Sequence, residues 1–186
     1  TVVPAIQRNA IPFTALTDAP LLSIVLIDMG PVRPDMAALA DFPVPLTVAI
    51  DPTTPDAMQV MTAYRAAGIE VAVLTPLPEG ASPADVEVAF QGFFAAVPEA
   101  VAVMDLPNAV LQSSRPRASQ VVEILSDSGH GMLTYQKGLN AALQLADTMQ
   151  VPAALVFREI DDGSHDIDRM KRFLDQAAFR AGQEGT

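Results

Sequence analysis

Short runs of apolar residues alternate with longer, partly polar stretches along almost the whole chain. The runs are rich in Val, Ile and Leu, and runs of this length and composition are typical of strands buried on both faces of a sheet. The first one ends in a carboxylate and a glycine, Asp28 and Gly30. The predicted strands are 22–27, 46–50, 71–74, 101–104, 132–135 and 154–157.

The stretches between these runs carry helix signals. Thr53-Thr54-Pro55-Asp56 and Ser82-Pro83-Ala84-Asp85 each place a hydroxyl N-cap, a proline and an acid at a predicted helix start. Phe90, Phe93 and Phe94 recur at helical spacing and are predicted to face the core. The predicted helices are 35–40, 53–67, 82–97, 115–128, 139–149 and 166–181.

Strict alternation of strands and helices predicts an α/β fold with a parallel sheet and right-handed crossovers. We count about six β/α units and no internal linker, so residues 21–186 are predicted to form one domain. Residues 1–20 contain three prolines and are predicted to form an extended N-terminal arm that docks on it. The pattern leaves both an open sheet and a barrel-like closure as alternatives.

Composition narrows the classes of function. The chain has 186 residues, is 50% hydrophobic and has a mean hydropathy of +0.28, as expected of a globular protein. A net charge of -11 argues against nucleic acid and anionic membrane surfaces as partners. The absence of cysteine excludes disulfides and thiolate metal sites. No apolar run approaches the roughly 18 residues of a membrane span.

Polar side chains follow the predicted strands, and the carboxyl ends of parallel strands meet at one edge of a sheet. They are predicted either to line a binding site or to be solvated loop residues, and Asp28 to border a cleft or to cap the next turn. These strand-end residues are Asp28, Asp51, Thr75, Asp105, Lys137, Arg158 and Glu159.

Several motifs of known chemistry are missing. The glycines after Asp28 form neither a dinucleotide fingerprint nor a phosphate loop, and no serine lies in a nucleophile elbow. His130 precedes a predicted strand, on the side opposite the acids, and His165 opens the last helix. One usable histidine disfavours zinc, whereas carboxylates such as Asp28 and Asp105 leave a harder cation as an alternative.

The order of motifs from Pro20 onward resembles the divergent polysaccharide deacetylase family. The motifs that carry the resemblance are Ser23-Ile24-Val25-Leu26-Ile27-Asp28-Met29-Gly30, Pro45-Leu46-Thr47-Val48-Ala49-Ile50, Pro55-Asp56-Ala57, Ala66-Ala67-Gly68-Ile69-Glu70-Val71, Thr75-Pro76-Leu77-Pro78, Val101-Ala102-Val103-Met104-Asp105, Gly131-Met132-Leu133 and Val156-Phe157-Arg158-Glu159. The resemblance implies a distorted β/α barrel, an exported or periplasmic location and kinship with enzymes that remove N-acetyl groups from amino sugars.

The resemblance also assigns roles to single positions. Asp28 matches the aspartate that acts as the base in related deacetylases, and Met29 replaces a metal-binding aspartate. Leu74 and Leu106 fall where the family has histidines. An expected aspartate falls near Tyr135, and Glu159 keeps the acid after the sixth strand. The zinc expected for the family therefore lacks its ligands in this chain.

Two hypotheses follow. The first is a deacetylase-like domain without catalysis or cofactor that binds an amino-sugar polysaccharide or a cell-envelope protein. The alternative is an active carbohydrate deacetylase or hydrolase with a rearranged site on Asp28, Asp105, Glu159 and His165. The resemblance places another strand and helix after Thr186, so we expect a truncated C-terminus and an open sheet edge that favours a homodimer.

Overall fold

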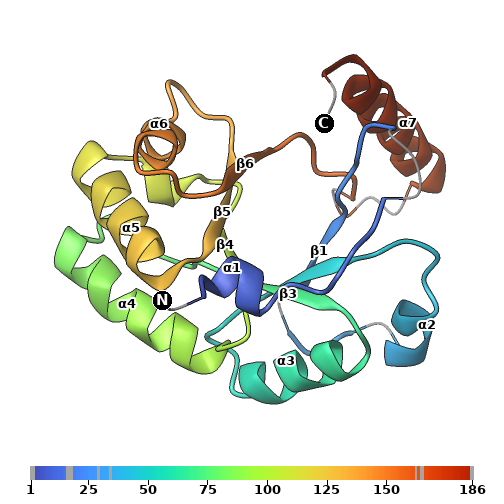
Figure 1. Cartoon of the computed structure of the whole chain (residues 1–186), viewed down its shortest axis with the longest axis horizontal. Coiled ribbons are helices and arrows are strands. Elements are labelled where there is room, and N and C mark those ends of the chain that lie inside the picture. The colour runs from blue at the N-terminus through green and yellow to red at the C-terminus, as the bar shows by residue number, and fades with distance from the viewer. Residues whose placement is uncertain are drawn as a thin grey trace.

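The computed structural model describes residues 3–15, 19–28, 30–33, 35–161, 163 and 166–184. Within them each strand pairs in parallel with the strand that follows it in the sequence. The strands are β1 (Val25–Asp28), β2 (Thr47–Ile50), β3 (Glu70–Leu74), β4 (Ala102–Met104), β5 (Gly131–Tyr135) and β6 (Ala153–Val156). The sheet curls into half of a barrel (Figure 1), which confirms the predicted incomplete β/α barrel.

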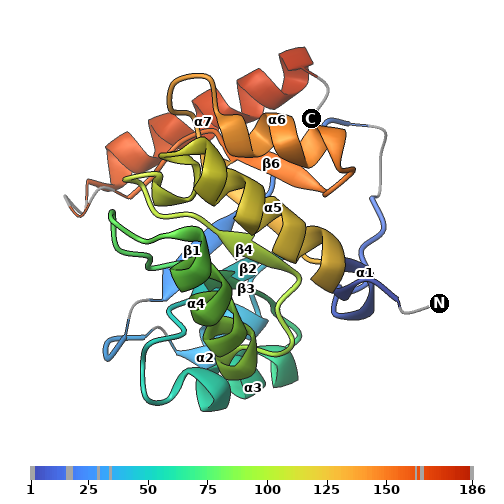
Figure 2. The same cartoon turned by 90° about the vertical axis from the view of Figure 1, so that its left-hand side faces the viewer.

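Helices fill the connections between the strands. In Figure 2, α4 and α5 lie side by side across the sheet, with α6 next to α5. Figure 1 shows α7 apart from these helices, on the side of the molecule where β1 lies. The helices are α1 (Ala5–Arg8), α2 (Met36–Ala40), α3 (Ala57–Ala66), α4 (Pro83–Ala96), α5 (Arg115–Ser128), α6 (Ala141–Thr148) and α7 (Ile167–Glu184), with a 3-10 turn η1 (Val110–Gln112).

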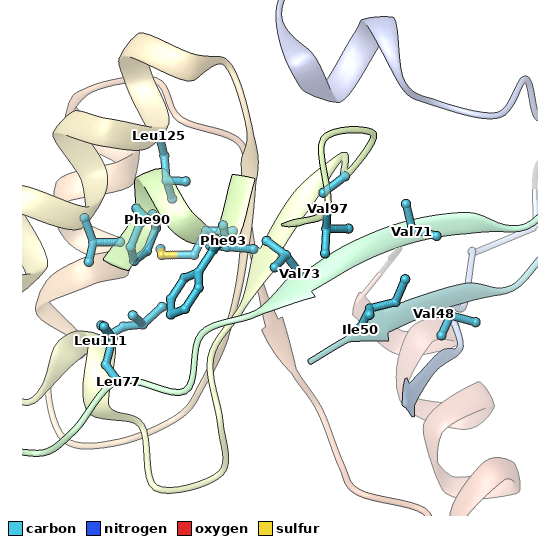
Figure 3. Close-up of a cluster of buried hydrophobic side chains, with 14 of the residues drawn as sticks. Val48, Ile50, Val71, Val73, Leu77, Phe90, Phe93, Val97, Leu111 and Leu125 are labelled. Atoms are coloured by element: carbon cyan, nitrogen blue, oxygen red, sulfur yellow. The ribbon is translucent and has the colours of Figure 1, made fainter. Parts of the chain in front are cut away.

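Alternation along the strands separates two apolar regions, because successive strand side chains point to opposite faces. Val48, Ile50, Val71 and Val73 belong to the larger core, together with Phe90 of α4 (Figure 3). The residues between them build a smaller cluster on the concave face. That cluster consists of Ala49, Ala72, Leu74 and Met104, all at most 3% exposed.

The N-terminal arm is not extended throughout, contrary to the prediction, because Ala5–Arg8 form one helical turn. The arm docks through hydrogen bonds that include the Ile6 amide donating to the Gly129 carbonyl at 2.8 Å. The Asn9 side chain donates to the Ala100 carbonyl at 2.9 Å. These carbonyls lie next to the starts of β4 and β5. The arm therefore packs at the amino-terminal ends of these strands, whereas the predicted site lies at their carboxyl ends.

Helix α3 starts later than predicted. Oδ1 of Asp51 accepts bonds from the amide and the hydroxyl of Thr53, at 2.9 and 2.7 Å, and forms a turn. The N-cap is therefore Asp56 and not a threonine hydroxyl, and the helix begins at Ala57. The predicted start of α4 is correct, because Ser82 and Asp85 form a reciprocal capping box.

Candidate functional site

The strand-end residues share one edge of the sheet, as predicted from the parallel strand order. Their side chains nevertheless divide into separate groups. No hydrogen bond or ion pair within the described part of the chain joins Asp28 to Asp105.

Asp28 belongs to the first group and points toward α3. Its Oδ2 accepts bonds from Nε of Arg33 at 2.6 Å and from the hydroxyl of Tyr64 at 2.9 Å. Its Oδ1 accepts a bond from the Gly30 amide at 3.0 Å. Asp28 is 7% exposed, and its carboxylate accepts hydrogen bonds from three donors.

Arg33 extends this group to a second carboxylate. Nη1 and Nη2 donate to the two oxygens of Asp56 at 2.8 and 3.3 Å, in a bidentate pair. The bonds to Asp56 and Asp28 raise the pKa of Arg33, and the bond from Arg33 lowers the pKa of Asp56. Burial, followed by the bond to Asp28, raises the pKa of Tyr64.

Sequence reasoning missed both Arg33 and Tyr64 as partners of Asp28. A weak signal for Arg33 existed, since it is the only Lys or Arg between Arg8 and Arg65. For Tyr64, the sequence indicated only that it lies in the predicted helix 53–67, and nothing pointed to a bond with Asp28.

Asp51 bonds within its own loop, whereas Thr75 bonds to the neighbouring strand β4. Asp51 holds the turn before α3. Thr75 is fully buried, and its hydroxyl donates to the Met104 carbonyl at 3.0 Å. Both residues therefore have structural roles, Asp51 within its turn and Thr75 between the end of β3 and β4.

Asp105 forms the second group and is completely buried. Oδ1 accepts bonds from the amides of Leu106 at 2.9 Å and Leu111 at 3.4 Å, and Oδ2 has no partner in the described part of the structure. Burial raises the pKa of Asp105 to about 6, against the opposing effects of these amides, of the Thr134 side chain and of Lys137. The carboxyl group therefore anchors η1 from below the surface.

Two amide side chains fix the end of β5 beside Asp105, and sequence reasoning did not single them out for this role. Nε2 of Gln112 donates to the Thr134 hydroxyl at 3.0 Å and to the Tyr135 carbonyl at 2.6 Å. Nδ2 of Asn140 donates to the same carbonyl at 3.3 Å. These contacts set the position of Tyr135, which packs against the concave apolar cluster.

The third group is exposed and lies at the ends of β5 and β6. Nζ of Lys137 donates to the Asn108 carbonyl at 2.7 Å. The Arg158 guanidinium lies 4.5 Å from the ring centroid of Phe173 in α7. Glu159 lies close enough to Tyr135 to add to the effect of burial, and the two raise the pKa of Tyr135 to about 12.

Of the two histidines, His130 lies among the described residues and His165 does not. Met29 also lies outside the described residues. His130 lies before β5, at the end of the sheet away from the acids as predicted, and is 5% exposed. Its ring stacks on Phe94 with centroids 4.1 Å apart, and burial lowers its pKa to about 4.

At Leu74 and Leu106, two of the positions where the resemblance expects metal ligands, the side chains are apolar. Leu74 lies inside the concave apolar cluster and Leu106 packs against it. Neither leucine offers a donor atom, whereas zinc takes nitrogen, sulfur or oxygen ligands. Within the described residues, no three His, Asp or Glu side chains lie close enough to share an ion. No described helix is long and apolar enough to cross a membrane.

Comparisons with known proteins agree with this fold. The family model described as divergent polysaccharide deacetylase matches residues 24–186. Among solved structures, the crystal structure of the uncharacterized protein ATU2773 from Agrobacterium tumefaciens C58 matches with a TM-score of 0.78 and 15% sequence identity. The match covers 98% of this chain and 80% of that chain, and at this identity it shows the fold alone. A search of curated proteins gave no match.

Proposed function

The chain belongs to the divergent polysaccharide deacetylase family, and we propose that it is a non-catalytic member that binds amino-sugar polysaccharide without hydrolysing it. The observation that carries this proposal is the packing of Leu74, at 1% exposure, inside an apolar cluster at a position where the resemblance expects a metal-binding histidine. The family framework is kept while the chemistry of that position is replaced.

Metal-assisted amide hydrolysis needs a cation that polarises the carbonyl and lowers the pKa of water from about 15.7 towards 7. Leu74 and Leu106 supply no ligand for that cation. Asp28, the base by resemblance, is already bound by Arg33 and Tyr64. Both oxygens of this carboxylate already accept hydrogen bonds from the protein, so a substrate would have to displace these donors to reach it.

The exposed third group supports carbohydrate binding at the ends of β5 and β6. Lys137, Arg158 and Glu159 offer charged hydrogen-bonding groups. Phe157 beside them is 49% exposed and offers an apolar face. Polar groups that fix orientation beside an apolar surface are the usual components of a small-ligand site.

The resemblance to deacetylases that act on amino sugars supports a proposal for the partner and the location. We propose an exported or periplasmic domain in carbohydrate metabolism, whose ligand is a cell-envelope polysaccharide. A cell-envelope protein, the other partner predicted from the sequence, is tested as a separate outcome.

An active hydrolase is the second candidate, and the raised pKa of Asp105 favours it. An acid with a pKa near the working pH suits general acid catalysis. Asp105 is, however, 0% exposed and is held under η1, so a substrate cannot reach it in this structure. The non-catalytic proposal therefore has the stronger support.

The test combines binding, turnover and metal content on one purified sample. We expect chito-oligomers to shift the NMR signals of residues near Arg158, with no acetate release and no stoichiometric zinc after zinc loading. Arg158→Ala is expected to weaken binding, and the distant surface variant Ser119→Ala to leave it unchanged. Stoichiometric zinc with acetate release that Asp28→Asn abolishes would establish the hydrolase instead. No binding of any oligomer would reject the glycan proposal and leave an envelope protein as the partner to test.

A further inference from the structure

We infer that Arg33 is a resident cation at the end of β1: its guanidinium group takes over the charge that a bound ion would supply to Asp28 and Asp56. The two carboxylates then form one cation site that the chain fills with its own side chain. The inference rests on this charge network and not on carbohydrate binding.

The geometry is that of a shared cation. Arg33 donates from Nε to Asp28 and from both terminal nitrogens to Asp56, over 2.6 to 3.3 Å. One guanidinium thus uses both of its edges on two carboxylates that are 28 residues apart in the sequence. Planar, bidentate contacts of this kind are specific to guanidinium and are not reproduced by an ammonium group.

The surroundings make the charge of Arg33 necessary. The side chain of Asp28 is 5% exposed, and the charged side chain that contacts it is Arg33, at 18% exposure. Tyr64 supplies a hydrogen bond but no charge. A buried carboxylate without a countercharge is costly, so some cation has to lie beside Asp28. Asp56, the second carboxylate, directly precedes α3, and the positive end of the helix dipole stabilises its negative charge.

A small cavity adjoins this network. It has a volume of about 50 Å³ and is lined by Asp28, Arg33 and Tyr64 together with apolar side chains. Removing the Arg33 side chain enlarges it next to both carboxylates. The shortened variant therefore offers a free guanidinium ion a site with the right charge and nearly the right shape.

This arrangement divides the carboxyl edge of the sheet. At the β1 side one guanidinium is shared by two carboxylates and so offsets only part of their charge, whereas Lys137 and Arg158 at the β5 and β6 side lie exposed. A ligand from outside then meets exposed charged side chains at β5 and β6, and at β1 it meets carboxylates that Arg33 already engages.

The experiment is chemical rescue. Arg33→Ala is expected to lower Tm, and low, non-denaturing guanidinium chloride is expected to raise its Tm relative to sodium chloride of equal ionic strength, because binding to the native state stabilises it. The wild type is expected to show no such rise. Arg65→Ala is the matched control, since Arg65 pairs with one carboxylate, Glu99, on the surface. The double variant Asp28→Asn with Arg33→Ala is expected to lose the rescue.

Equal rescue of Arg65→Ala and Arg33→Ala, or no rescue of a folded Arg33→Ala protein, would overturn the inference and leave the carbohydrate proposal untouched. A measurement on the unmodified protein covers the case in which Arg33→Ala does not fold. The NMR signal of the Arg33 Nε–H group is expected to persist unchanged when zinc or magnesium, which are both diamagnetic, is added. Its loss at one equivalent of either metal would show that an external cation displaces Arg33, which also contradicts the inference.

Discussion

The hydroxyl of Tyr64 donates a hydrogen bond to Oδ2 of Asp28 across 2.9 Å, although 36 residues separate them in the sequence. Tyr64 lies in α3 and Asp28 ends β1, so the bond ties the first strand to the helix that follows the second. Because Tyr64 is 1% exposed, water does not compete strongly for this bond. The position of the proposed resident cation Arg33 depends on the carboxylate that this bond fixes.

Replacing Tyr64 by Phe should lower the free energy of unfolding by about 1–3 kcal/mol, because buried Asp28 loses a hydrogen-bond donor. Urea denaturation measures the difference. Tyr135→Phe is the comparison variant, because the Tyr135 hydroxyl interacts with Glu159, which is exposed, and not with a buried carboxylate. An equal loss in both variants would show that the bond to buried Asp28 adds no more stability than a contact with an exposed acid.

Replacing Gly129 by Ala should detach the N-terminal arm. The added Cβ would lie 2.6 Å from Cα of Pro4 and 2.9 Å from the Ala5 amide nitrogen, in a backbone with φ of +72°. Hydrogen exchange at the Ile6 amide, which donates to the Gly129 carbonyl, should accelerate. Gly68→Ala shares the positive φ, at +76°, but meets nothing within 4 Å. It should cost only the backbone strain of about 1–2 kcal/mol and leave Ile6 protected.

Buried His130 should make the protein less stable in mild acid. Its pKa is about 4 in the folded chain against 6.5 ordinarily, so the unfolded chain binds the proton first. The stabilisation is therefore complete above about pH 6.5 and is lost as the pH falls towards 4. A shift of this size corresponds to about 3 kcal/mol. Denaturation curves of His130→Gln across this interval should lack this contribution, and an unchanged pH dependence would contradict it.

Asp105 should act in the opposite direction. Its pKa is about 6 in the folded chain against 3.8 ordinarily, so here the folded chain binds the proton first. Its burial therefore lowers stability as the pH rises from about 4 to 6, again by about 3 kcal/mol. Asp105→Asn should remove this loss and leave the rise due to His130 visible. The prediction fails if stability between these pH values changes equally in Asp105→Asn and the wild type.

Replacing Arg117 by Lys should destabilise the loops that follow β3 and β4. The guanidinium is 5% exposed as a residue and donates to the carbonyls of Glu79, Ala81 and Val110. A lysine cannot reach all of these acceptors, and each buried one left unpaired costs about 1–3 kcal/mol. Denaturation measures the loss, which should reach about 3 kcal/mol. Arg115→Lys on the exposed side of α5 should remain within about 0.5 kcal/mol of the wild type.

The local sequence correctly predicted features that are set by residues close to one another in the chain. Ser82 and Asp85 form the capping box that their spacing indicated, and Phe90 lies in the core as its helical periodicity indicated. The helical turn of the N-terminal arm was not predicted. This turn, Ala5–Arg8, lies where the arm docks on Gly129. Short helices are marginal alone and form when tertiary contacts favour them.

The sequence by itself determined the alternation of strands and helices, the parallel pairing of the strands and the edge at which Asp28, Asp105 and Glu159 would lie, because apolar periodicity and short connections leave few other arrangements. The spatial order of the strands, and the choice between an open sheet and a half-barrel, came from the tertiary structure. Only the tertiary structure decided what each acid contacts: Arg33 and Tyr64 for Asp28, buried amides for Asp105, and the surface beside Tyr135 for Glu159. The physical reason is that strands follow from patterns within a few residues, whereas a side chain's partners depend on which face it takes and on residues brought close by packing.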